Sequence, residues 1–281
     1  MDQRDGSSAV AVLQDNDRGR SPGQAASSRS QGTVLVLRKA VAILRAFSHE
    51  QPVLTLQDLR AMTGLPMTTC QRLVTNLVAE RVLERSGDSY SIGRSVLEWA
   101  AIAKQARPLN QLLSGILNDL RNDTEETACA FTPQGRFRIC VEVIPTMLPV
   151  RPQTYVGQAV PLHIGAAGKV MLAFNEDLLR AAQREELEQV TEKTITDHGQ
   201  LELEMKRIRK SGWSISQEEG TSGLAGVAAP VFDADGAVVA SIALSVPTQR
   251  AGRQRLRALV PVVVEAASRA SDMLGYDRDG G

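Results

Sequence analysis

The sequence has little cysteine and no net charge, and each of these absences narrows the range of functions. Its 281 residues hold three cysteines, none of them in a CxxC pair. So few scattered thiols exclude a disulfide framework, and we expect Cys70, Cys129 and Cys140 to be reduced rather than metal-bound. The 32 basic side chains equal the 32 acidic ones, so any attraction to nucleic acid must come from a local patch.

Long apolar runs are absent as well. No stretch approaches the roughly 20 apolar residues of a membrane-spanning helix, and the first residues lack the apolar core of a signal peptide. We therefore expect a cytoplasmic protein that does not contact a membrane. At this length, with 43% hydrophobic residues, two domains with packed cores are the expected organisation.

Composition divides the chain into four segments. Residues 1–32 are rich in Gly, Ser, Gln, Asp and Arg, which is typical of a disordered tail. Apolar residues at three- and four-residue steps follow, Val36 and Leu37 among them, and predict one buried face of a helix. We predict a helix-turn-helix domain over 33–94, a linker helix over 95–108 and a second domain over 109–276.

Residues 55–74, TLQDLRAMTGLPMTTCQRLV, have the pattern of two short helices joined by a tight turn. Thr55 is a good N-cap, with Asp58 at the capping-box offset. Gly64 can take a left-handed conformation in the turn, and Pro66 fits the first turn of the second helix. The next residues predict a hairpin, or wing, over 82–92. This arrangement allows a protein to place its second helix in the major groove of DNA.

The side chains around this helix pair suit a polyanion. Between residues 34 and 94 there are eight Lys or Arg and five Asp or Glu, so eight minus five leaves three positive charges in excess. Gln71 suits adenine, and Arg72 suits guanine or phosphate. The predicted DNA-binding residues are Thr55, Met67, Thr68, Thr69, Gln71, Arg72, Asn76 and Arg85.

A winged helix that binds another protein is the alternative, because a helix-turn-helix pattern alone is a weak signal. Three features favour DNA: the glycine in the turn, the exposed run Thr68-Thr69-x-Gln71-Arg72, and the wing that follows directly.

The second domain mixes strands and helices without βαβ alternation, so we predict an α+β fold with a mixed, mostly antiparallel sheet. The predicted strands are 128–131 and 137–143 around a turn at 132–135, an extended segment at 156–162, and 227–232 and 237–246 around a second turn. The predicted helices are 109–120, 165–174, 176–189, 201–210 with Gly212 as its C-terminal cap, and 254–274, kinked or broken at Pro261.

Nothing in the sequence assembles an active site, and we expect neither an enzyme nor a cofactor. The run GAAGK at 165–169 has the wrong spacing for a phosphate loop. Glu218 and Glu219 are adjacent and would point to opposite sides of a strand. No histidine has a cysteine or carboxylate at ligand spacing, so no metal site is expected.

The chain resembles the IclR family of bacterial transcription regulators. The N-terminal resemblance lies in LRKAVAILRAF, LTLQDLRAMTGLPMTTCQRLVTNLVAERVLER and YSIG, and the C-terminal one in VGQAVPLHIGAAGKVMLAF and SGWSISQEEGTSGLAGVAAPVFDADGAVVASIALSVP. It runs from about Val34 to about Leu274. It implies a winged helix-turn-helix, a linker helix, a GAF-like domain that binds a small-molecule effector, and homodimers that often pair into homotetramers.

The resemblance also implies where the effector binds. The pocket is lined by the helix start within GAAGK, by the segment 216–226, and by the strand that carries positions 243 and 245. The predicted effector-binding residues are Tyr155, His163, Ala166, Ala167, Ser216, Leu224, Gly226, Ala243 and Ser245. A histidine packed in front of the helix is an equally good interpretation of His163.

Three of these positions depart from relatives that bind small keto-acids. Those relatives tend to carry Asp, Cys and Ser where this chain has Ser216, Gly226 and Ala243. Our hypothesis is therefore a larger, more apolar effector, such as an aromatic metabolite, whose carboxylate would meet the N–H groups at the start of the 165–174 helix.

The combined prediction is a ligand-responsive regulator that binds a double-stranded DNA operator and controls a catabolic or neighbouring operon. Repression is favoured over activation. The alternative is a sensor or scaffold whose winged helix binds protein. Whether the effector promotes or releases DNA binding stays open.

Overall fold

A computed structural model describes residues 35–48, 50–105 and 108–277. The chain divides into two compact units, residues 1–106 and residues 107–281, and each unit is described by itself. The tail predicted over 1–32 lies outside the described residues. Among the described helices, none has the length and apolar character needed to cross a membrane.

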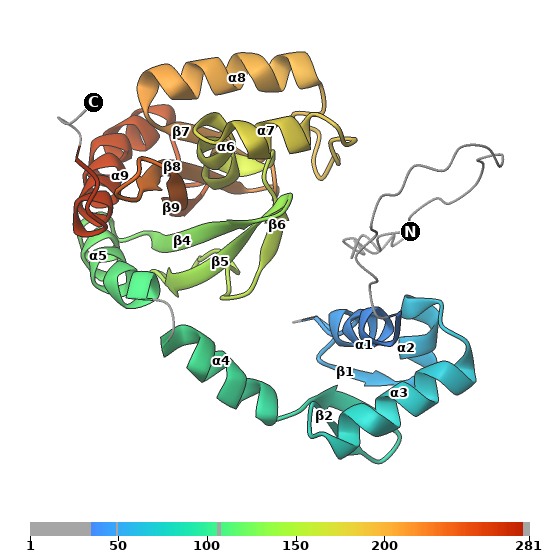
Figure 1. The fold of residues 1–281 in the computed structure, drawn as a ribbon. Coiled ribbons are helices and arrows are strands. Elements are labelled where there is room, and N and C mark those ends of the chain that lie inside the picture. Colours follow the sequence, from blue (N-terminus) through green and yellow to red (C-terminus); the bar gives the residue numbers. More distant parts are fainter. Residues whose placement is uncertain (1–34, 49, 106–107, 278–281) are drawn as a thin grey trace. The chain divides into compact units, whose positions relative to one another are not determined.

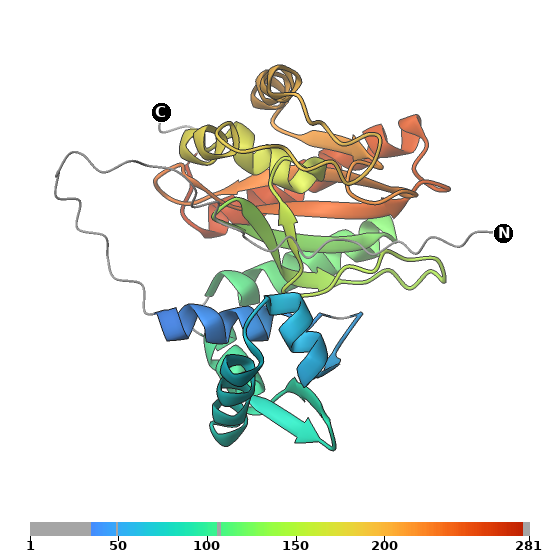
Figure 2. The same ribbon diagram turned by 90° about the vertical axis from the view of Figure 1, so that its right-hand side faces the viewer.

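The first unit is a winged helix-turn-helix. Its elements are α1 (Leu35–Arg45), β1 (Val53–Thr55), α2 (Leu56–Thr63), α3 (Met67–Ala79), β2 (Leu83–Ser86), β3 (Ser89–Ile92) and α4 (Ser95–Gln105). The three strands form an antiparallel sheet in the order β1-β3-β2. Figure 2 shows α3, in teal, beside the β2–β3 hairpin that forms the wing. The short strand β1 was not predicted from the sequence.

Local chemistry fixes the turn between α2 and α3. The Thr55 hydroxyl accepts the Asp58 N–H at 3.2 Å, while the Thr55 N–H donates to Asp58 Oδ2 at 2.8 Å, which completes a capping box. Gly64 has φ 65°, and its N–H donates to the Arg60 carbonyl at 3.0 Å. Pro66 stands one residue before α3 rather than in its first turn.

The burial predicted for α1 is only partly correct. Ile43 is fully buried against α2 and α3, but Val36 and Leu37 are exposed within this unit. The periodic pattern therefore identified the helix correctly, while the N-terminal part of its apolar face is not covered by the described residues of the first unit.

The second unit is a six-stranded antiparallel sheet with helices on both faces. Its helices are α5 (Pro108–Thr124), α6 (Gly165–Ala173), α7 (Glu176–Ala182), α8 (His198–Ser211) and α9 (Arg253–Met273). Its strands are β4 (Thr127–Gln134), β5 (Phe137–Ile144), β6 (Ala159–Pro161), β7 (Ser214–Gln217), β8 (Leu224–Phe232) and β9 (Val238–Pro247). The strand order is β6-β5-β4-β9-β8-β7.

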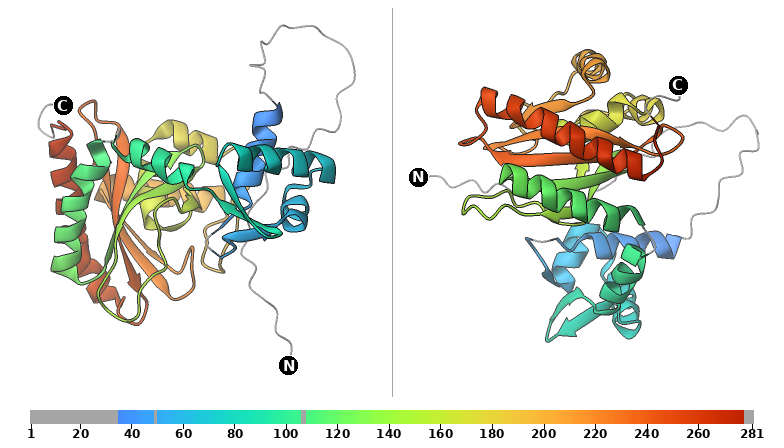
Figure 3. Two further views of the ribbon diagram at one scale, coloured as in Figure 1. Left: turned by 90° about the horizontal axis from the view of Figure 1, so that it is seen from below. Right: turned by 90° about the vertical axis from the view of Figure 1, so that its left-hand side faces the viewer.

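Each face of this sheet buries its own core. Helices α5 and α9 pack side by side on one face, as Figure 3 shows. Helices α6, α7 and α8 cover the other face (Figure 1). Because side chains alternate along a strand, the α6 side of the sheet receives Cys129 and Phe131 of β4, Ala228 of β8 and Ala243 of β9.

Several boundaries differ from the prediction. Strand β4 continues through the predicted turn, because Pro133 lies beyond the part of β4 that pairs with β9 and needs no N–H on that side. The turn falls on Gly135 and Arg136 instead. Helix α7 ends at Ala182 rather than at 189, and α9 continues through Pro261 as one helix.

Candidate functional site

Helix α3 presents one polar side away from its core. Cys70, Leu73 and Val74 are buried inside the unit. The six α3 residues of the predicted DNA-binding set are all exposed or half-buried: Met67, Thr68, Thr69, Gln71, Arg72 and Asn76. Arg72 forms no ion pair with any described residue, so its guanidinium is available to a partner.

The two remaining predicted DNA contacts already have structural partners. Thr55 is committed to the capping box of α2. In the wing, Arg85 Nε donates to the Gly87 carbonyl at 2.7 Å, and the Arg85 guanidinium lies 5.9 Å from the centre of the Tyr90 ring. Its side chain is still 57% exposed, so Arg85 can stiffen the wing and also face a partner.

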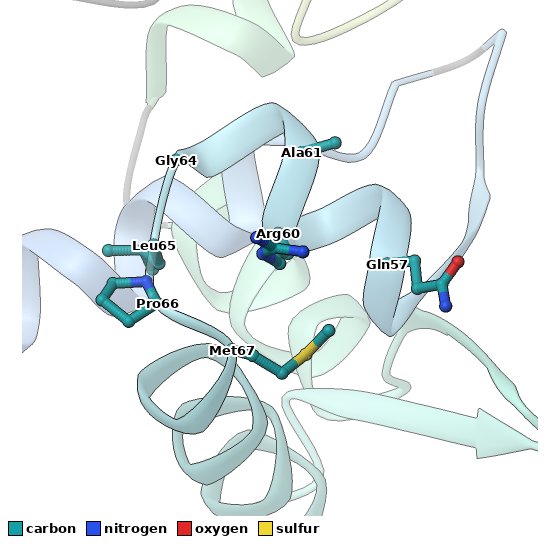
Figure 4. A pocket seen from close by; sticks show the side chains of 7 residues that line it. All are labelled: Gln57, Arg60, Ala61, Gly64, Leu65, Pro66 and Met67. Carbon is teal, nitrogen blue, oxygen red and sulfur yellow. The ribbon is translucent and has the colours of Figure 1, made fainter.

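A surface hollow lies on the concave side of the α2–α3 turn. Figure 4 shows Gln57, Arg60 and Met67 along its rim, with Gly64 and Pro66 at the turn itself. Its volume is about 490 Å³. The hollow borders the N-terminal end of α3, where backbone N–H groups and the helix dipole favour a negative charge.

The start of α6 is a second meeting point of predicted residues. The Ala166 N–H donates to Ser216 Oγ at 3.0 Å. Ser216 is the cross-strand neighbour of Gly226, which in turn lies opposite Ser245. A Cβ at Gly226 would stand 3.2 Å from Ser216 Oγ and 3.6 Å from the Ala166 Cβ, so this position is closely packed.

The other predicted effector residues are distributed over β8, β9, α6 and the loop before β6. Leu224 and Ala243 face the same side of the sheet as Gly226. Ala167 is buried next to Ala166 in α6. Tyr155 is half-buried in the loop before β6.

His163 has its own partner. Its Nε2 lies 3.0 Å from the Glu188 carbonyl, and burial lowers the pKa of the imidazole below its ordinary value. The interpretation as a packed histidine therefore fits the geometry.

The N–H groups expected to receive an effector carboxylate are already used. The Gly165 N–H donates to Glu219 Oε2 at 2.9 Å, alongside the bond between Ala166 and Ser216. Glu218 and Glu219 do not lie on a strand, because β7 ends at Gln217 and Glu218 turns the chain with φ 57°. This turn brings the buried Glu219 carboxylate to the start of α6.

A buried ion network extends from this carboxylate. Lys169, which is 1% exposed, places Nζ 2.6 Å from Glu219 Oε1 and 3.2 Å from Glu204 Oε1. Arg207 Nη2 lies 2.7 Å from Glu204 Oε1. Burial alone would raise the pKa of Glu204, but the hydrogen bonds and charges of Arg207 and Lys169 lower it to about 2. The network links α6, α8 and the loop after β7.

Sequence reasoning missed this network, although one signal could have found it. Lys169 stands in the middle of a short helix whose other residues are small or apolar. A lysine in such a position must pair with a carboxylate, because an isolated buried charge is very costly.

Arg138 on β5 was also missed. Its Nη1 donates to the carbonyl oxygens of Ile164 and, at 3.5 Å, of Pro161. Its guanidinium lies 5.0 Å from the centre of the Phe131 ring. Burial lowers the pKa of Arg138 to about 10, against the opposing effects of the nearby thiols and of Glu219. A half-buried cation therefore lies directly beside the start of α6.

Two family models cover most of the chain. Residues 36–87 match the IclR helix-turn-helix domain, and residues 101–272 match the bacterial transcriptional regulator IclR C-terminal domain. The HTH-type transcriptional regulator KipR of Bacillus subtilis is 29% identical over 241 residues, which are 85% of this chain and 96% of KipR. The transcriptional repressor IclR of Escherichia coli is 26% identical over 256 residues, covering 89% of this chain and 93% of the repressor.

A solved structure shares the fold. The IclR homolog of Microbacterium hydrocarbonoxydans, complexed with 4-hydroxybenzoate, has a TM-score of 0.74 at 21% identity and covers 85% of this chain and 98% of its own. These relatives are transcription regulators and not enzymes, which agrees with the expectation from the sequence. The chain belongs to the IclR family of bacterial transcription regulators, with a helix-turn-helix DNA-binding domain and a C-terminal effector domain.

Proposed function

We propose that the protein is a cytoplasmic repressor of a catabolic or neighbouring operon and that it reads its operator with α3. An aromatic or otherwise hydrophobic metabolite controls its binding to DNA. The observation that carries the proposal is the polar side of α3, where Thr68, Gln71, Arg72 and Asn76 are exposed together above a buried core. The repressor role is supported by the relative in Escherichia coli, which is itself named a repressor.

The proposed DNA contacts fall into two groups, those to base edges and those to phosphates. Gln71 and Arg72 are suited to base edges in the major groove, whereas Thr68 and Thr69 can bond phosphates. The hollow beside Arg60 and the start of α3 can receive a backbone phosphate. Arg85 extends the same surface through the wing.

Two copies are needed to place two recognition helices on one operator. On α4, Leu97, Trp99 and Ile102 are 71%, 54% and 63% exposed within the first unit. Large exposed apolar side chains on several sides of one helix are unfavourable in water and suit a contact with a second copy of the chain. We propose homodimers that pair further into homotetramers.

The effector is proposed to bind on the α6 side of the C-terminal sheet. The small side chains at Gly226 and Ala243 make this face apolar, which supports a hydrophobic ligand. The 4-hydroxybenzoate bound to the Microbacterium relative supports an aromatic one. The ligand acts by its different affinity for DNA-competent and DNA-incompetent arrangements of the subunits.

DNase I footprinting over the region upstream of the protein's own gene tests this function. A dimer with two recognition helices predicts two protected half-sites whose centres are about 10 base pairs apart, or a multiple of that distance. The absence of any protected half-site, even at a high protein concentration, would contradict the proposal.

A further inference from the structure

The Arg138 guanidinium has no carboxylate partner within hydrogen-bond distance among the described residues. Its Nη1 bonds two backbone carbonyls, and its Nε is buried without any acceptor. The nearby Glu219 carboxylate forms no hydrogen bond with it and directs its two oxygens to Lys169 and the Gly165 N–H instead. A buried charged donor without an acceptor is costly, which points to a ligand group that completes the site.

Two other arginines also have a buried Nε without an acceptor, but neither has the same surroundings as Arg138. Arg136, in the turn just before β5, also has a buried Nε without an acceptor, but its Nη1 lies 2.6 Å from Glu185 Oε2 and its charge is balanced. Arg121 has a similar Nε, but it belongs to α5 on the opposite face of the sheet. Of the three, Arg138 alone combines an unbalanced charge with a position beside α6.

The free edge of this guanidinium has a defined shape. Nε and Nη2 form a planar two-donor fork that matches the two oxygens of a carboxylate. Nη2 lies 3.5 Å from the place where a side-chain carbon at Gly165 would stand, so the lack of a side chain there leaves the approach to Nη2 open. The Phe131 ring covers the guanidinium and the buried thiols of Cys129 and Cys140 lie on the same side of the sheet, while the polar groups of Ser216 and Glu219 lie toward the start of α6.

We propose that Arg138 holds a carboxylate of the effector through Nε and Nη2, and that the rest of this effector is an apolar body. The inference rests on the proposed function, because it names the chemical class that the regulatory site accepts. It also replaces the helix N–H groups as the partner of that carboxylate, since Glu219 and Ser216 occupy two of them.

Isothermal titration calorimetry on the full-length protein tests the inference with three acids and their neutral amides. The acids are benzoate, phenylacetate and hexanoate, and each amide has nearly the same shape without the charge. Wild-type protein is expected to bind at least one acid more tightly than its amide. Arg138→Met, and also Arg138→Lys, which keeps the charge but loses the fork, should weaken binding of that acid by about 10- to 100-fold.

Arg136→Lys is the matched control, because it changes an arginine in the turn before β5 whose side chain contacts Glu185 and Phe137 rather than the start of α6. It should bind the acids as wild-type protein does. Equal acid binding by wild-type protein and both Arg138 variants overturns the inference, and so does failure of wild-type protein to prefer any acid over its amide. Circular dichroism melting checks that each variant is folded.

Operator binding by wild-type protein, measured without any acid, separates this inference from the proposed function. If wild-type protein binds its operator but acid binding is insensitive to Arg138, only the carboxylate site is wrong. If wild-type protein binds no operator, the proposed function fails whatever the acids do.

Discussion

Lys169 Nζ lies 2.6 Å from Glu219 Oε1, and the two side chains are 2% and 10% exposed. The same Glu219 carboxylate accepts the Gly165 N–H at the start of α6. A charge carried by the protein itself therefore occupies part of the helix terminus where an effector carboxylate was expected. This arrangement fixes α6 against the loop after β7 and leaves the neighbouring Arg138 without an ion pair in the part of the chain that the structure describes.

Breaking the ion pair between Lys169 and Glu219 should destabilise the C-terminal unit. Lys169→Met leaves a buried carboxylate without its cation, and we expect a loss of about 3–5 kcal/mol in the free energy of unfolding. Adding Glu219→Gln removes the unpaired negative charge and should recover part of the lost stability. Urea unfolding followed by circular dichroism measures both, with Lys206→Met on the exposed side of α8 as control. A double variant no more stable than Lys169→Met would contradict the pairing.

Acid should weaken the ion network in a defined pH range. The pKa of Glu204 is about 2 in the folded chain, against an ordinary value of 4.5, so its charged form stabilises the fold above about pH 4.5. This stabilisation decreases as the pH falls toward 2, because the unfolded chain binds the proton first. Glu204→Gln should therefore flatten the pH dependence of the unfolding free energy below pH 5. The exposed Glu186→Gln removes a carboxylate outside the network and should leave that slope unchanged.

Substitutions on α3 should weaken operator binding in two different ways. Gln71→Ala removes a base-reading group and should reduce the preference for operator over unrelated DNA, at a cost of about 1–3 kcal/mol. Arg72→Ala should weaken binding as well, and if Arg72 contacts a phosphate the salt dependence of log K should fall by about one unit. Thr69→Ala should weaken operator binding too. Titrations over a range of salt concentrations separate the contributions, and Arg184→Ala in the C-terminal unit serves as control. Unchanged operator affinity in both Arg72→Ala and Thr69→Ala would show that α3 does not read the groove.

The capping box of α2 gives a stability prediction that is independent of DNA. Thr55→Ala removes the hydroxyl that accepts the Asp58 N–H and should cost about 1 kcal/mol in unfolding free energy. Thr55→Ser keeps the oxygen and should cost much less. Thermal unfolding of the two variants compares them, and equal melting temperatures would mean that the cap contributes little.

The exposed apolar residues of α4 should govern oligomeric state. Leu97→Glu places a charge on the proposed contact between copies, so it should shift the molecule toward monomer. Sedimentation velocity over a range of concentrations measures the shift, with Glu98→Gln on the same helix as control. An unchanged distribution would place the contact between copies elsewhere.

Features fixed by neighbouring residues were predicted well from the sequence. The Thr55 cap, the left-handed Gly64 and Gly212, and the α+β class all follow from local chemistry and periodicity. Helix α7 was predicted too long because a distant contact decides its end: His163 bonds the Glu188 carbonyl, and Leu187 is buried in the core on the α6 side.

The residues around the start of α6 were harder to predict, because their contacts also join residues that are far apart in the sequence. Glu219 reaches α6 across 50 residues, and Arg138 reaches the carbonyl of Ile164 across 26. Neither pairing has a signature in residue spacing. Predicting them would require knowing that the sheet brings β5 and the loop after β7 to the same end of α6.

Sequence-specific operator binding is the property on which the proposed function depends. Fluorescence anisotropy can compare the full-length protein on labelled DNA from upstream of its own gene and on a shuffled sequence of equal composition, at one salt concentration. We predict that the upstream DNA binds at least about 10³-fold more tightly than the shuffled DNA. Equal affinity for the two would contradict the assignment of α3 as an operator-reading helix.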